Sequence, residues 1–402
     1  MTAGGDILFL VHRIPFPPDR GDKIRSYHML KAFAEMAPVH VGCFADDDRD
    51  MGFATDLARV AASQCVVRRD RSKAMAGLAG LFSHRSILVS IYENPELHRW
   101  VSEILATRPI RAIVAYSVQM ATYVPLDLPP GCRFMMDFVD FDSAKYAAYG
   151  SEQDGFMGWV NRREGRVLLD FEREVARRAT ISTFVSAAEA QLFAQTADVQ
   201  DRDVQALDNG VNLNYFNIEE DISPIENEEN PLLVFTGQMD YRPNIEAVES
   251  FAREALPIVR AKYPTATFVI VGRNPTPQVQ ALALQPGVIV TGGVPDIRGW
   301  LMAADVVVAP LRIARGIQNK VLEAMAMGRP VVASPQAAEG IDAVNGEHFV
   351  VAADPQAEAE AVRALLADPQ QAALLGKAAR ARMEQRYDWA ATLAPLREMV
   401  LG

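Results

Sequence analysis

The sequence predicts an α/β protein built from two doubly wound domains that face each other across a cleft. The chain has 402 residues, more than one ordinary domain holds, so two domains of about 200 residues are expected. Short unbroken apolar runs alternate with longer amphipathic segments, which is typical of parallel strands covered by helices on both faces. Residues 219–230, EEDISPIENEEN, are acidic and lack apolar periodicity, which indicates a linker or exposed loop. Ligands collect at the carboxyl ends of such strands, so we expect the cleft to hold the site.

The strand candidates fall into two series, one in each half of the chain. The first half has strand candidates at residues 7–12, 40–44, 65–68, 112–116, 134–137 and 180–186. The second half starts again with candidates at residues 232–236, 267–272, 288–291, 305–309, 330–333 and 348–351. Residues from Asp368 onward are predicted to be helical. We therefore place one domain at 1–217, a second at 218–384, and a last helix at 385–402 that packs back on the first domain.

Composition narrows the class of protein. Half of the residues are apolar and 23% are charged, the balance of a globular chain with a full core. The formal net charge of -11 argues against a nucleic-acid partner, whose phosphates require a basic surface. The cysteines Cys43, Cys65 and Cys132 are far apart and form no CxxC pair, which favours a reducing cytoplasm and no structural zinc.

The sequence also bears on membrane association. The apolar run near the N-terminus has no basic leader or cleavage site and reads as a first strand, and no stretch approaches the roughly 20 apolar residues of a span. Residues 68–92 place a basic cluster beside apolar residues at helical spacing, which suits an interfacial helix on anionic lipid at the inner face of a membrane. An ordinary helix with a solvated basic start explains the same pattern equally well. The basic residues are Arg68, Arg69, Arg71 and Lys73, and the apolar ones are Met75, Leu78, Leu81 and Phe82.

Residues 315–334, RGIQNKVLEAMAMGRPVVAS, carry the strongest chemical signal. A helix that is apolar on most sides follows Gly316, and Glu323 is a carboxylate within it. A buried charge needs strong hydrogen-bond partners, and two ribose hydroxyls would supply them. The turn before the helix presents free N–H groups suited to a diphosphate, and Arg315 and Lys320 can add charge-assisted bonds. The alternative is that Glu323 caps or salt-bridges a core helix. The apolar residues are Val321, Leu322, Ala324, Met325 and Ala326.

The segment LEAMAMGRPVVAS at residues 322–334 resembles the donor-site helix of glycosyltransferase family 4, retaining enzymes of the GT-B fold. Further segments resemble the same family in the right order along nearly the whole chain. These are the loop at 15–33, NGVN at 209–212 with Phe216, TGQM at 236–239 with Pro243 and Asn244, FVIVGR at 268–273, and VTGGV at 290–294.

This resemblance implies transfer of a hexose from a nucleoside diphosphate sugar to an acceptor hydroxyl with retained anomeric configuration. It implies no metal and no other cofactor. Residues 218–384 would bind the donor and residues 1–217 would form the acceptor side, with no particular catalytic residue assigned. The implied donor-binding residues are Gly21, Asp22, Lys23, Gly237, Arg242, Arg273, Arg315, Gly316, Asn319, Lys320 and Glu323.

Residues 12–31, 136–150 and 235–248 are similar to the bacterial sugar transferases of PEP-CTERM/exosortase systems. That similarity implies a role in exopolysaccharide or other cell-surface glycan biosynthesis, with a glycan or lipid-linked acceptor. The enzyme would work in the cytoplasm, with peripheral contact to the membrane through residues 68–92.

The chain departs from the family pattern at three places. Arg315 stands where family 4 usually has a Glu that contacts sugar hydroxyls. Gln238 and the nearby Arg242 replace the usual Arg and Lys pair, and a single Gly21 replaces paired glycines. The phosphate charge would then be met by some of Arg242, Arg273, Arg315 and Lys320. Two alternatives stay open, a sugar-nucleotide epimerase of the same fold and a donor-binding pseudoenzyme.

Motifs of other enzyme classes are absent from the sequence, and further candidate site residues have a structural explanation as well as a functional one. The sequence contains no GxGxxG after a strand, no GxxxxGK[ST] loop, no HExxH and no GxSxG. His12 ends the first predicted strand and can face the cleft, although a lone histidine is more often structural. Asp137, Asp140 and Asp142 follow another strand and suit a metal or an acceptor hydroxyl, or equally a structural hydrogen-bond set.

Overall fold

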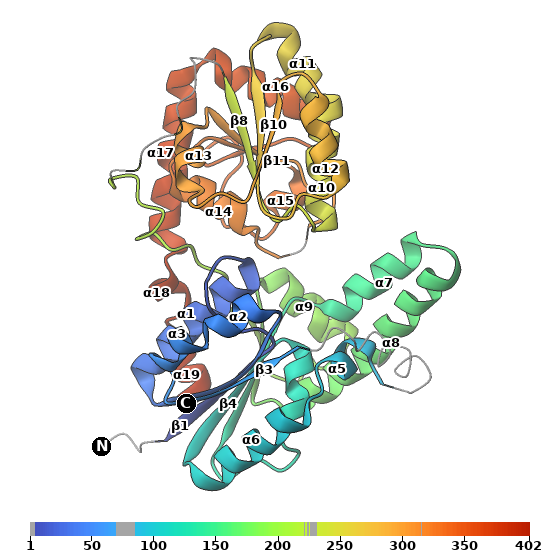
Figure 1. The fold of residues 1–402 in the computed structure, drawn as a ribbon, viewed down its shortest axis with the longest axis vertical. Coiled ribbons are helices and arrows are strands. Elements are labelled where there is room, and N and C mark those ends of the chain that lie inside the picture. The colour runs from blue at the N-terminus through green and yellow to red at the C-terminus, as the bar shows by residue number, and fades with distance from the viewer. Residues whose placement is uncertain (1–4, 70–84, 221, 223–224, 226–230, 315) are drawn as a thin grey trace. The chain divides into compact units, whose positions relative to one another are not determined.

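The computed structural model describes residues 5–69, 85–220, 222, 225, 231–314 and 316–402. The chain forms two compact units, which Figure 1 shows as ribbons. Unit 1 comprises Met1–Asp208 and Leu393–Gly402, and unit 2 comprises Asn209–Thr392. The segment after Asp208 belongs to unit 2 because Val211 and Phe216 are buried in its core, and the Val211 N–H donates to the Tyr387 carbonyl at 2.6 Å. The functional limits at 217 and 384 stay a prediction.

Unit 1 contains a seven-stranded parallel sheet in the order β3-β2-β1-β4-β5-β6-β7. Every strand predicted in this half is present, and all except the partly exposed edge strand β3 are apolar runs buried on both faces. β7 was not predicted, since it is a three-residue edge strand without buried side chains. The strands are β1 (Asp6–Val11), β2 (Val39–Ala45), β3 (Ser63–Arg68), β4 (Ile110–Tyr116), β5 (Arg133–Val139), β6 (Ile181–Phe184) and β7 (Val204–Ala206).

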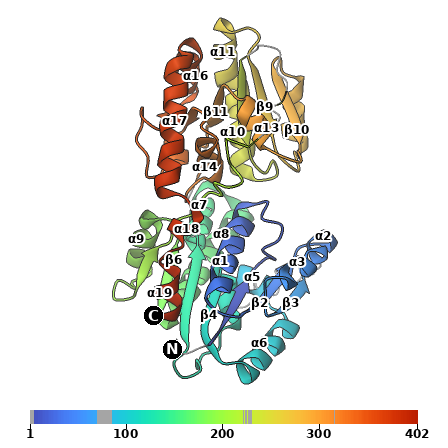
Figure 2. The same ribbon diagram turned by 90° about the vertical axis from the view of Figure 1, so that its left-hand side faces the viewer.

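Helices cover the sheet of unit 1 on both sides. α1 and α19 pack against each other and against β1, β2, β4 and β5, whereas α6 and α8 lie on the other side (Figures 1 and 2). Arg25 of α1 and Asp137 of β5 form a fully buried pair with Nε and Oδ2 2.9 Å apart. The helices are α1 (Gly21–Met36), α2 (Asp48–Gly52), α3 (Ala54–Ala58), α5 (Ile87–Ile91), α6 (Pro95–Thr107), the 3₁₀ helix η2 (Val118–Tyr123), α7 (Asp142–Glu152), α8 (Gly155–Arg178), α9 (Ala187–Thr196) and α19 (Leu396–Leu401).

Unit 2 contains a six-stranded parallel sheet in the order β10-β9-β8-β11-β12-β13. The predicted strands of this half are all present. They are β8 (Leu232–Thr236), β9 (Thr267–Val271), β10 (Val288–Gly292), β11 (Val306–Ala309), β12 (Val331–Ala333) and β13 (Val350–Val351). Its helical segments are α10 (Arg242–Ser250), the π-helical η3 (Phe251–Ala255), α11 (Leu256–Lys262), α12 (Pro277–Ala281), the 3₁₀ η4 (Leu282–Leu284), α13 (Arg298–Ala303), α14 (Asn319–Ala326), α15 (Pro335–Ala338), α16 (Pro355–Ala367), α17 (Pro369–Arg386) and α18 (Trp389–Thr392).

Both sheets reverse their strand order at one position. The first strand of unit 1, β1, lies between β2 and β4, and the first strand of unit 2, β8, lies between β9 and β11. Connections leave in opposite directions at these points, which opens a crevice at the carboxyl ends of the two central strands. Ligands of doubly wound sheets bind there, so the two places to search are the β1/β4 and β8/β11 edges.

Candidate functional site

Glycines at the carboxyl ends of β8, β9 and β10 in unit 2 bring three loops into backbone contact. The Gly237 N–H donates to the Val271 carbonyl at 3.0 Å, and the Gly272 N–H donates to the Gly292 carbonyl at 3.1 Å. A Cβ on Gly272 would lie 1.7 Å from the Gly237 carbonyl oxygen, so only glycine fits. The loop after β8 is therefore held by the chain that follows β9.

Lys320 and Asn244 connect this loop to α14. The helix begins at Asn319, after Gly316 with a φ of 64°, and buries the five apolar residues expected from the sequence. Lys320 Nζ donates to Asn244 Oδ1, and Asn244 Nδ2 donates to the Gln238 carbonyl at 2.8 Å. Lys320 Nζ also lies 4.6 Å from the centre of the Phe235 ring. A Cβ on Gly237 would be 3.4 Å from Lys320 Nζ, which places the ammonium beside the glycine loop.

Glu323 lies one helical turn after Lys320. Burial lowers the pKa of Lys320 to about 7, and the nearby Glu323 opposes that shift. Burial likewise raises the pKa of Glu323 to about 7, against the influence of Lys320. Among the described residues, no hydrogen bond or ion pair engages the Glu323 carboxylate. The helix thus presents a lysine and a carboxylate whose charged forms are poorly solvated by the protein. A ligand phosphate would stabilise the charged lysine, and ligand hydroxyls would donate hydrogen bonds to the carboxylate.

The other residues predicted for unit 2 lie around this centre. Asn319 starts α14, and its buried Oδ1 has no hydrogen-bond partner among the described residues. Arg273 follows Gly272, and its side chain lies against Gly293, where a Cβ would be 2.7 Å from Arg273 Cγ. Arg242 begins α10, where its exposed guanidinium pairs with Glu246 at 2.7 Å. Arg315 lies outside the described residues.

Asn244 is a residue that the predicted donor set lacked. Its side chain is 4% exposed and holds both the glycine loop and Lys320, although it comes from α10. The sequence did contain a signal for this residue, the Pro243-Asn244 pair that follows TGQM. Asn244 was missed because the phosphate-binding candidates were sought among charged residues and glycines.

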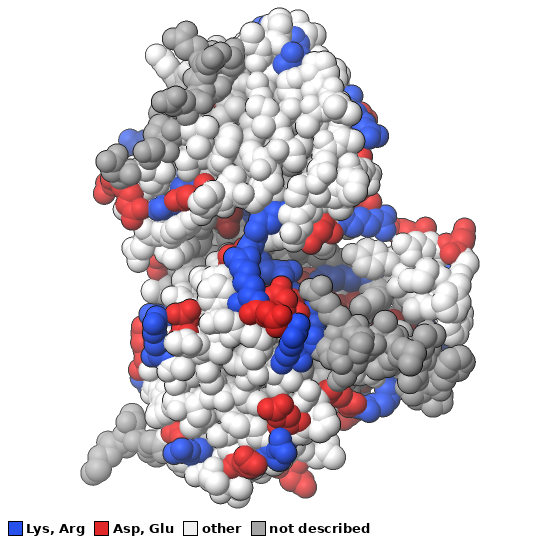
Figure 3. All heavy atoms as spheres, viewed as in Figure 1, with Lys and Arg blue, Asp and Glu red and all other residues white. Residues whose placement is uncertain are grey.

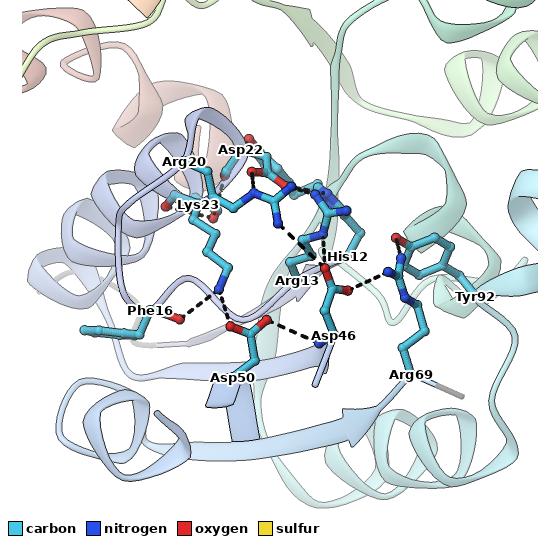
Figure 4. A network of polar contacts seen from close by, with 12 residues as sticks. His12, Arg13, Phe16, Arg20, Asp22, Lys23, Asp46, Asp50, Arg69 and Tyr92 are labelled. Carbon is cyan, nitrogen blue, oxygen red and sulfur yellow. Dashed lines mark hydrogen bonds and ion pairs between the residues drawn. The ribbon is translucent and has the colours of Figure 1, made fainter. Parts of the chain in front are cut away.

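The predicted residues of unit 1 start α1, next to the β1/β4 edge. Gly21, Asp22 and Lys23 form its first turn, but the Lys23 side chain is only 2% exposed. Its Nζ donates to Asp50 Oδ1 at 2.6 Å and to the Phe16 carbonyl at 3.2 Å (Figure 4). Because the ammonium is engaged inside the unit, a phosphate contact from this segment would have to come from first-turn backbone N–H groups.

A basic network surrounds Asp22 and Asp46 (Figure 4). Asp22 accepts from His12 Nε2 at 3.3 Å and from Arg13 Nη1, and Arg20 Nε is 3.6 Å away. Asp46 pairs with Arg13 Nε at 2.9 Å and with Arg69 Nη2 at 3.0 Å. Burial alone would raise the pKa of Asp22, but the contacts with His12, Arg13 and Arg20 hold it well below its usual range. We call His12, Arg13, Arg20, Arg69, Asp22 and Asp46 the basic network.

Two further groups are engaged within unit 1. The His12 ring stacks on Tyr116 with ring centres 5.6 Å apart. Asp137 pairs with Arg25 as described, and Lys145 Nζ contacts Asp140 Oδ2 at 2.5 Å and Asp142 Oδ1 at 3.3 Å. These contacts favour the structural reading of the three aspartates. In the part of the chain that is described, no group of three or more His, Cys, Asp or Glu residues is placed to hold a metal ion.

The segment at 68–92 is described only at its ends. Residues 70–84, with Arg71, Lys73 and all four of its apolar residues, lie outside the described residues. Arg68 pairs with Asp48 at 2.9 Å, and Arg69 belongs to the basic network. Within the described ranges, no helix is both long and apolar enough to cross a membrane.

Comparisons with known proteins agree with the geometry of unit 2. Residues 230–368 match the family of group 1 glycosyl transferases. A phosphatidyl-myo-inositol mannosyltransferase of Propionibacterium freudenreichii is 33% identical over 129 residues, 31% of each chain. A GDP-mannose-dependent alpha-(1-6)-phosphatidylinositol monomannoside mannosyltransferase of Mycolicibacterium smegmatis is 28% identical over 266 residues, 61% of this chain and 68% of that protein. The first of these relatives is therefore matched over about a third of its length.

Solved structures match over the whole chain. A sucrose-phosphate synthase from Thermosynechococcus elongatus superposes with a TM-score of 0.70 at 18% identity, covering 98% of both chains. Anabaena HepE in complex with UDP has a TM-score of 0.64 at 18% identity over 98% of both chains. WaaG, a glycosyltransferase involved in lipopolysaccharide biosynthesis, has a TM-score of 0.65 at 17% identity over 98% of this chain and 100% of its own.

The fold and the site define an α/β protein with the GT-B fold, so the predicted fold class is confirmed. Within unit 2, residues 230–368 are those that match group 1 glycosyl transferases, and Lys320 and Glu323 lie among the matched residues.

Proposed function

We propose that the chain is a retaining, family 4-like glycosyltransferase that moves a hexose from a nucleoside diphosphate sugar to an acceptor hydroxyl. The observation that carries the proposal is the placement of Lys320 one helical turn before Glu323, in the residues that match group 1 glycosyl transferases, with no hydrogen-bond or ion-pair partner for the Glu323 carboxylate among the described residues. Residues 218–384 bind the donor and residues 1–217 serve the acceptor.

The donor's parts match the groups at this site. The Glu323 carboxylate accepts hydrogen bonds from the ribose hydroxyls, and the Lys320 ammonium binds the diphosphate. Arg315, Arg273 and Arg242 add positive charge, and the backbone at Gly237 and Gly316 allows close approach. In unit 1, the first-turn N–H groups at Gly21, Asp22 and Lys23 are the proposed phosphate donors.

The chemical contribution of these groups is to stabilise the leaving diphosphate. Charge develops on that group as the bond to the sugar breaks, so cations and N–H dipoles already in place lower the barrier. Holding Lys320 through Asn244 means that little reorganisation is needed when the charge appears.

The relatives suggest where the reaction belongs. The matched mannosyltransferases are named for phosphatidylinositol-type lipids and one for GDP-mannose, while HepE was solved with UDP. We propose a guanosine or uridine diphosphate sugar as donor and a glycan or lipid-linked acceptor. The role would be in cell-surface glycan assembly, as in the bacterial PEP-CTERM-associated exopolysaccharide systems, on the cytoplasmic side of the membrane.

A thermal-shift screen with uridine, guanosine and adenosine diphosphates and their sugars identifies the donor. Incubation with that donor then tests the class of activity. Slow hydrolysis that releases the sugar with its anomeric configuration retained supports the transferase. Interconversion of the intact donor would establish the epimerase instead, and binding without either reaction would establish the pseudoenzyme.

A matched pair of variants tests the assignment of the phosphate site. Replacing Lys320 and Arg315 together by Gln should weaken the sugar nucleotide far more than the free nucleoside, because only the former carries the diphosphate. Lys377→Gln is the control, since Lys377 is an exposed lysine on α17 of the same unit. Equal weakening of both ligands, or of neither, would contradict the assignment.

A further inference from the structure

The α7–α8 hairpin of unit 1 ends in a group of exposed apolar side chains. α7 runs outward from the carboxyl end of β5, residues 153 and 154 make the turn, and α8 runs back (Figure 1). At the start of α8, Phe156 is 66% exposed, Met157 58% and Trp159 47%. The rings of Phe156 and Trp159 stack with centres 6.0 Å apart. We call these three residues the hairpin tip.

The hairpin is built to hold this tip in place. A Cβ on Gly158 would lie 1.8 Å from the Gln153 carbonyl oxygen, and a Cβ on Gly150 would lie 2.6 Å from Arg162 Cγ. These glycines let the two helices approach closely, and Arg162 Nη1 donates to the Gly150 carbonyl at 2.6 Å. Asn161 Nδ2 also donates to Gln153 Oε1 at 3.0 Å. The exposed side chains are thus presented by a preformed element, which lowers the entropy lost when they bind a partner.

The base of the hairpin is also fixed. The Ser143 hydroxyl and N–H of α7 both donate to the buried Glu172 of α8. Further along α8, the Glu164 carboxylate accepts from the Ser86 hydroxyl at 2.5 Å and from the Ile87 N–H at 3.0 Å. The hairpin is therefore anchored in unit 1 at its base and apolar at its outer end.

The size and shape of the tip decide between two kinds of partner. Aromatic side chains bury about 150–250 Å² each, so the partly exposed tip offers on the order of 400 Å². A stable protein interface needs roughly 800 Å² on each side, and a projecting end of a hairpin is a poor fit for it. Insertion of Trp, Phe and Met side chains into the interfacial zone of a bilayer needs no such area.

The charges around the tip specify the type of lipid. Glu152 and Asp154 are exposed beside it, and so are Arg162 and Arg166 on α8. Two negative and two positive charges leave the surroundings of the tip neutral, so anionic lipid brings no net attraction here. This differs from the basic segment at 68–92, for which anionic lipid would be the partner.

We propose that the hairpin tip is a membrane anchor that inserts Phe156, Met157 and Trp159 into a zwitterionic phospholipid surface. The proposal does not depend on the sugar-transfer activity. It does explain how a chain of net charge -11 can reach a lipid-linked substrate without an electrostatic attraction.

Flotation of the full chain with phosphatidylcholine vesicles tests this anchor. The native protein should float at physiological salt and equally at about 0.5 M salt, because insertion of apolar groups is not screened. The triple variant F156S/M157S/W159S should partition at least about tenfold less. The control L126S/L284S/L374S removes three other exposed apolar side chains, which are 77%, 89% and 62% exposed, and should float like the native protein.

A spectroscopic measurement locates the contact independently. Brominated phosphatidylcholine should quench part of the native tryptophan fluorescence, and W159F should float normally but lose that quenched part. Failure of the native protein to float, or flotation of the triple variant at the native level, would overturn the proposal. Self-association of the native protein that the triple variant abolishes, without flotation, would overturn it as well and make the tip an interface between copies.

Discussion

The carboxyl edges of both sheets carry lysine, arginine and acidic side chains. In unit 1 these side chains form ion pairs with each other, whereas in unit 2 Lys320 and Glu323 form no ion pair among the described residues. At the edge of unit 1, the charges pair with each other, as Arg13 and Arg69 do with Asp46 and as Lys23 does with Asp50. Figure 3 shows basic and acidic side chains adjoining one another near α2 of this unit. At the edge of unit 2, the Lys320 ammonium donates to the neutral amide of Asn244, and the Glu323 carboxylate has no hydrogen-bond or ion-pair partner among the described residues.

The difference separates groups that stabilise the fold from groups that are available to a ligand. A buried ion pair already satisfies its charges, so a ligand gains little from it, and removing one partner leaves the other uncompensated. Buried charged groups that form no ion pair destabilise the folded protein because they are desolvated. A ligand that supplies hydrogen bonds or opposite charge removes this penalty, and the free energy gained adds to its affinity. Substitutions of the paired charges in unit 1 should therefore lower the free energy of unfolding, and substitutions of the charged groups in unit 2 should lower the affinity for nucleotide.

The largest effect is expected from Gly272→Ala. The added Cβ would lie 1.7 Å from the Gly237 carbonyl oxygen, so the loop after β8, which lies beside Lys320, must shift. We expect nucleotide binding to fall below detection and the free energy of unfolding to drop by about 2–4 kcal/mol. Calorimetric titration and denaturant unfolding measure the two. Gly52→Ala is the control because no atom lies within 4 Å of its Cβ, and normal binding by the Gly272 variant would show that the glycine contact does not shape the site.

Asp46→Asn tests the self-paired edge. It leaves Arg13 and Arg69 without their shared carboxylate, which should cost about 2–4 kcal/mol of unfolding free energy. Nucleotide affinity, measured by titration under folding conditions, should stay near the native value because Asp46 pairs with arginine side chains and is not among the proposed donor-binding residues. An unchanged stability with weaker nucleotide binding would reverse the roles assigned to the two edges.

Glu323→Ala should show the opposite pattern. Loss of a charged acceptor for the ribose hydroxyls should weaken nucleotide binding by about 1.5–3 kcal/mol, and Glu323→Gln by about 1 kcal/mol. Stability should change little, since no described residue depends on this carboxylate. Glu360→Ala, at an exposed position of α16, serves as the control in the same calorimetric titration. Native affinity in the Glu323 variants would remove this residue from the site.

The effect that requires no substitution is a proton taken up when the diphosphate binds. Burial lowers the pKa of Lys320 to about 7, so the free ammonium is largely deprotonated above that pH. A bound diphosphate favours the charged form and raises the pKa, so affinity should fall by up to about tenfold per unit as pH rises from about 7.5 to 9. Titration in buffers of different ionisation enthalpy counts the proton. Lys320→Gln should show no uptake, and a native protein without uptake would mean that Lys320 is already charged.

Several features of the fold were predictable from local pattern. Buried parallel strands appear as apolar runs, so the strands and their two series were found, whereas the exposed edge strand β7 carried no such pattern. Glu323 could be singled out as a candidate because a carboxylate interrupts an apolar helix. Lys23 was expected at a phosphate, and its pairing with Asp50 could not be foreseen because the two residues lie 27 positions apart.

By itself, the sequence determined the fold class, the strand candidates and the position of the helix that carries Lys320 and Glu323, because these depend on hydrophobic periodicity and on residues adjacent along the chain. Only the tertiary structure decided which charged groups are available. Arg13, Arg20 and Lys23 look as suitable for phosphate as Lys320 does in the sequence, but aspartates in the first turn of α1 and in α2 neutralise the first three. Lys320 meets the side chain of Asn244 instead, a neutral partner brought from 76 positions away. Whether a charge is compensated depends on its distance in space to other charged groups. These distances between residues far apart in the sequence are known only from the folded structure.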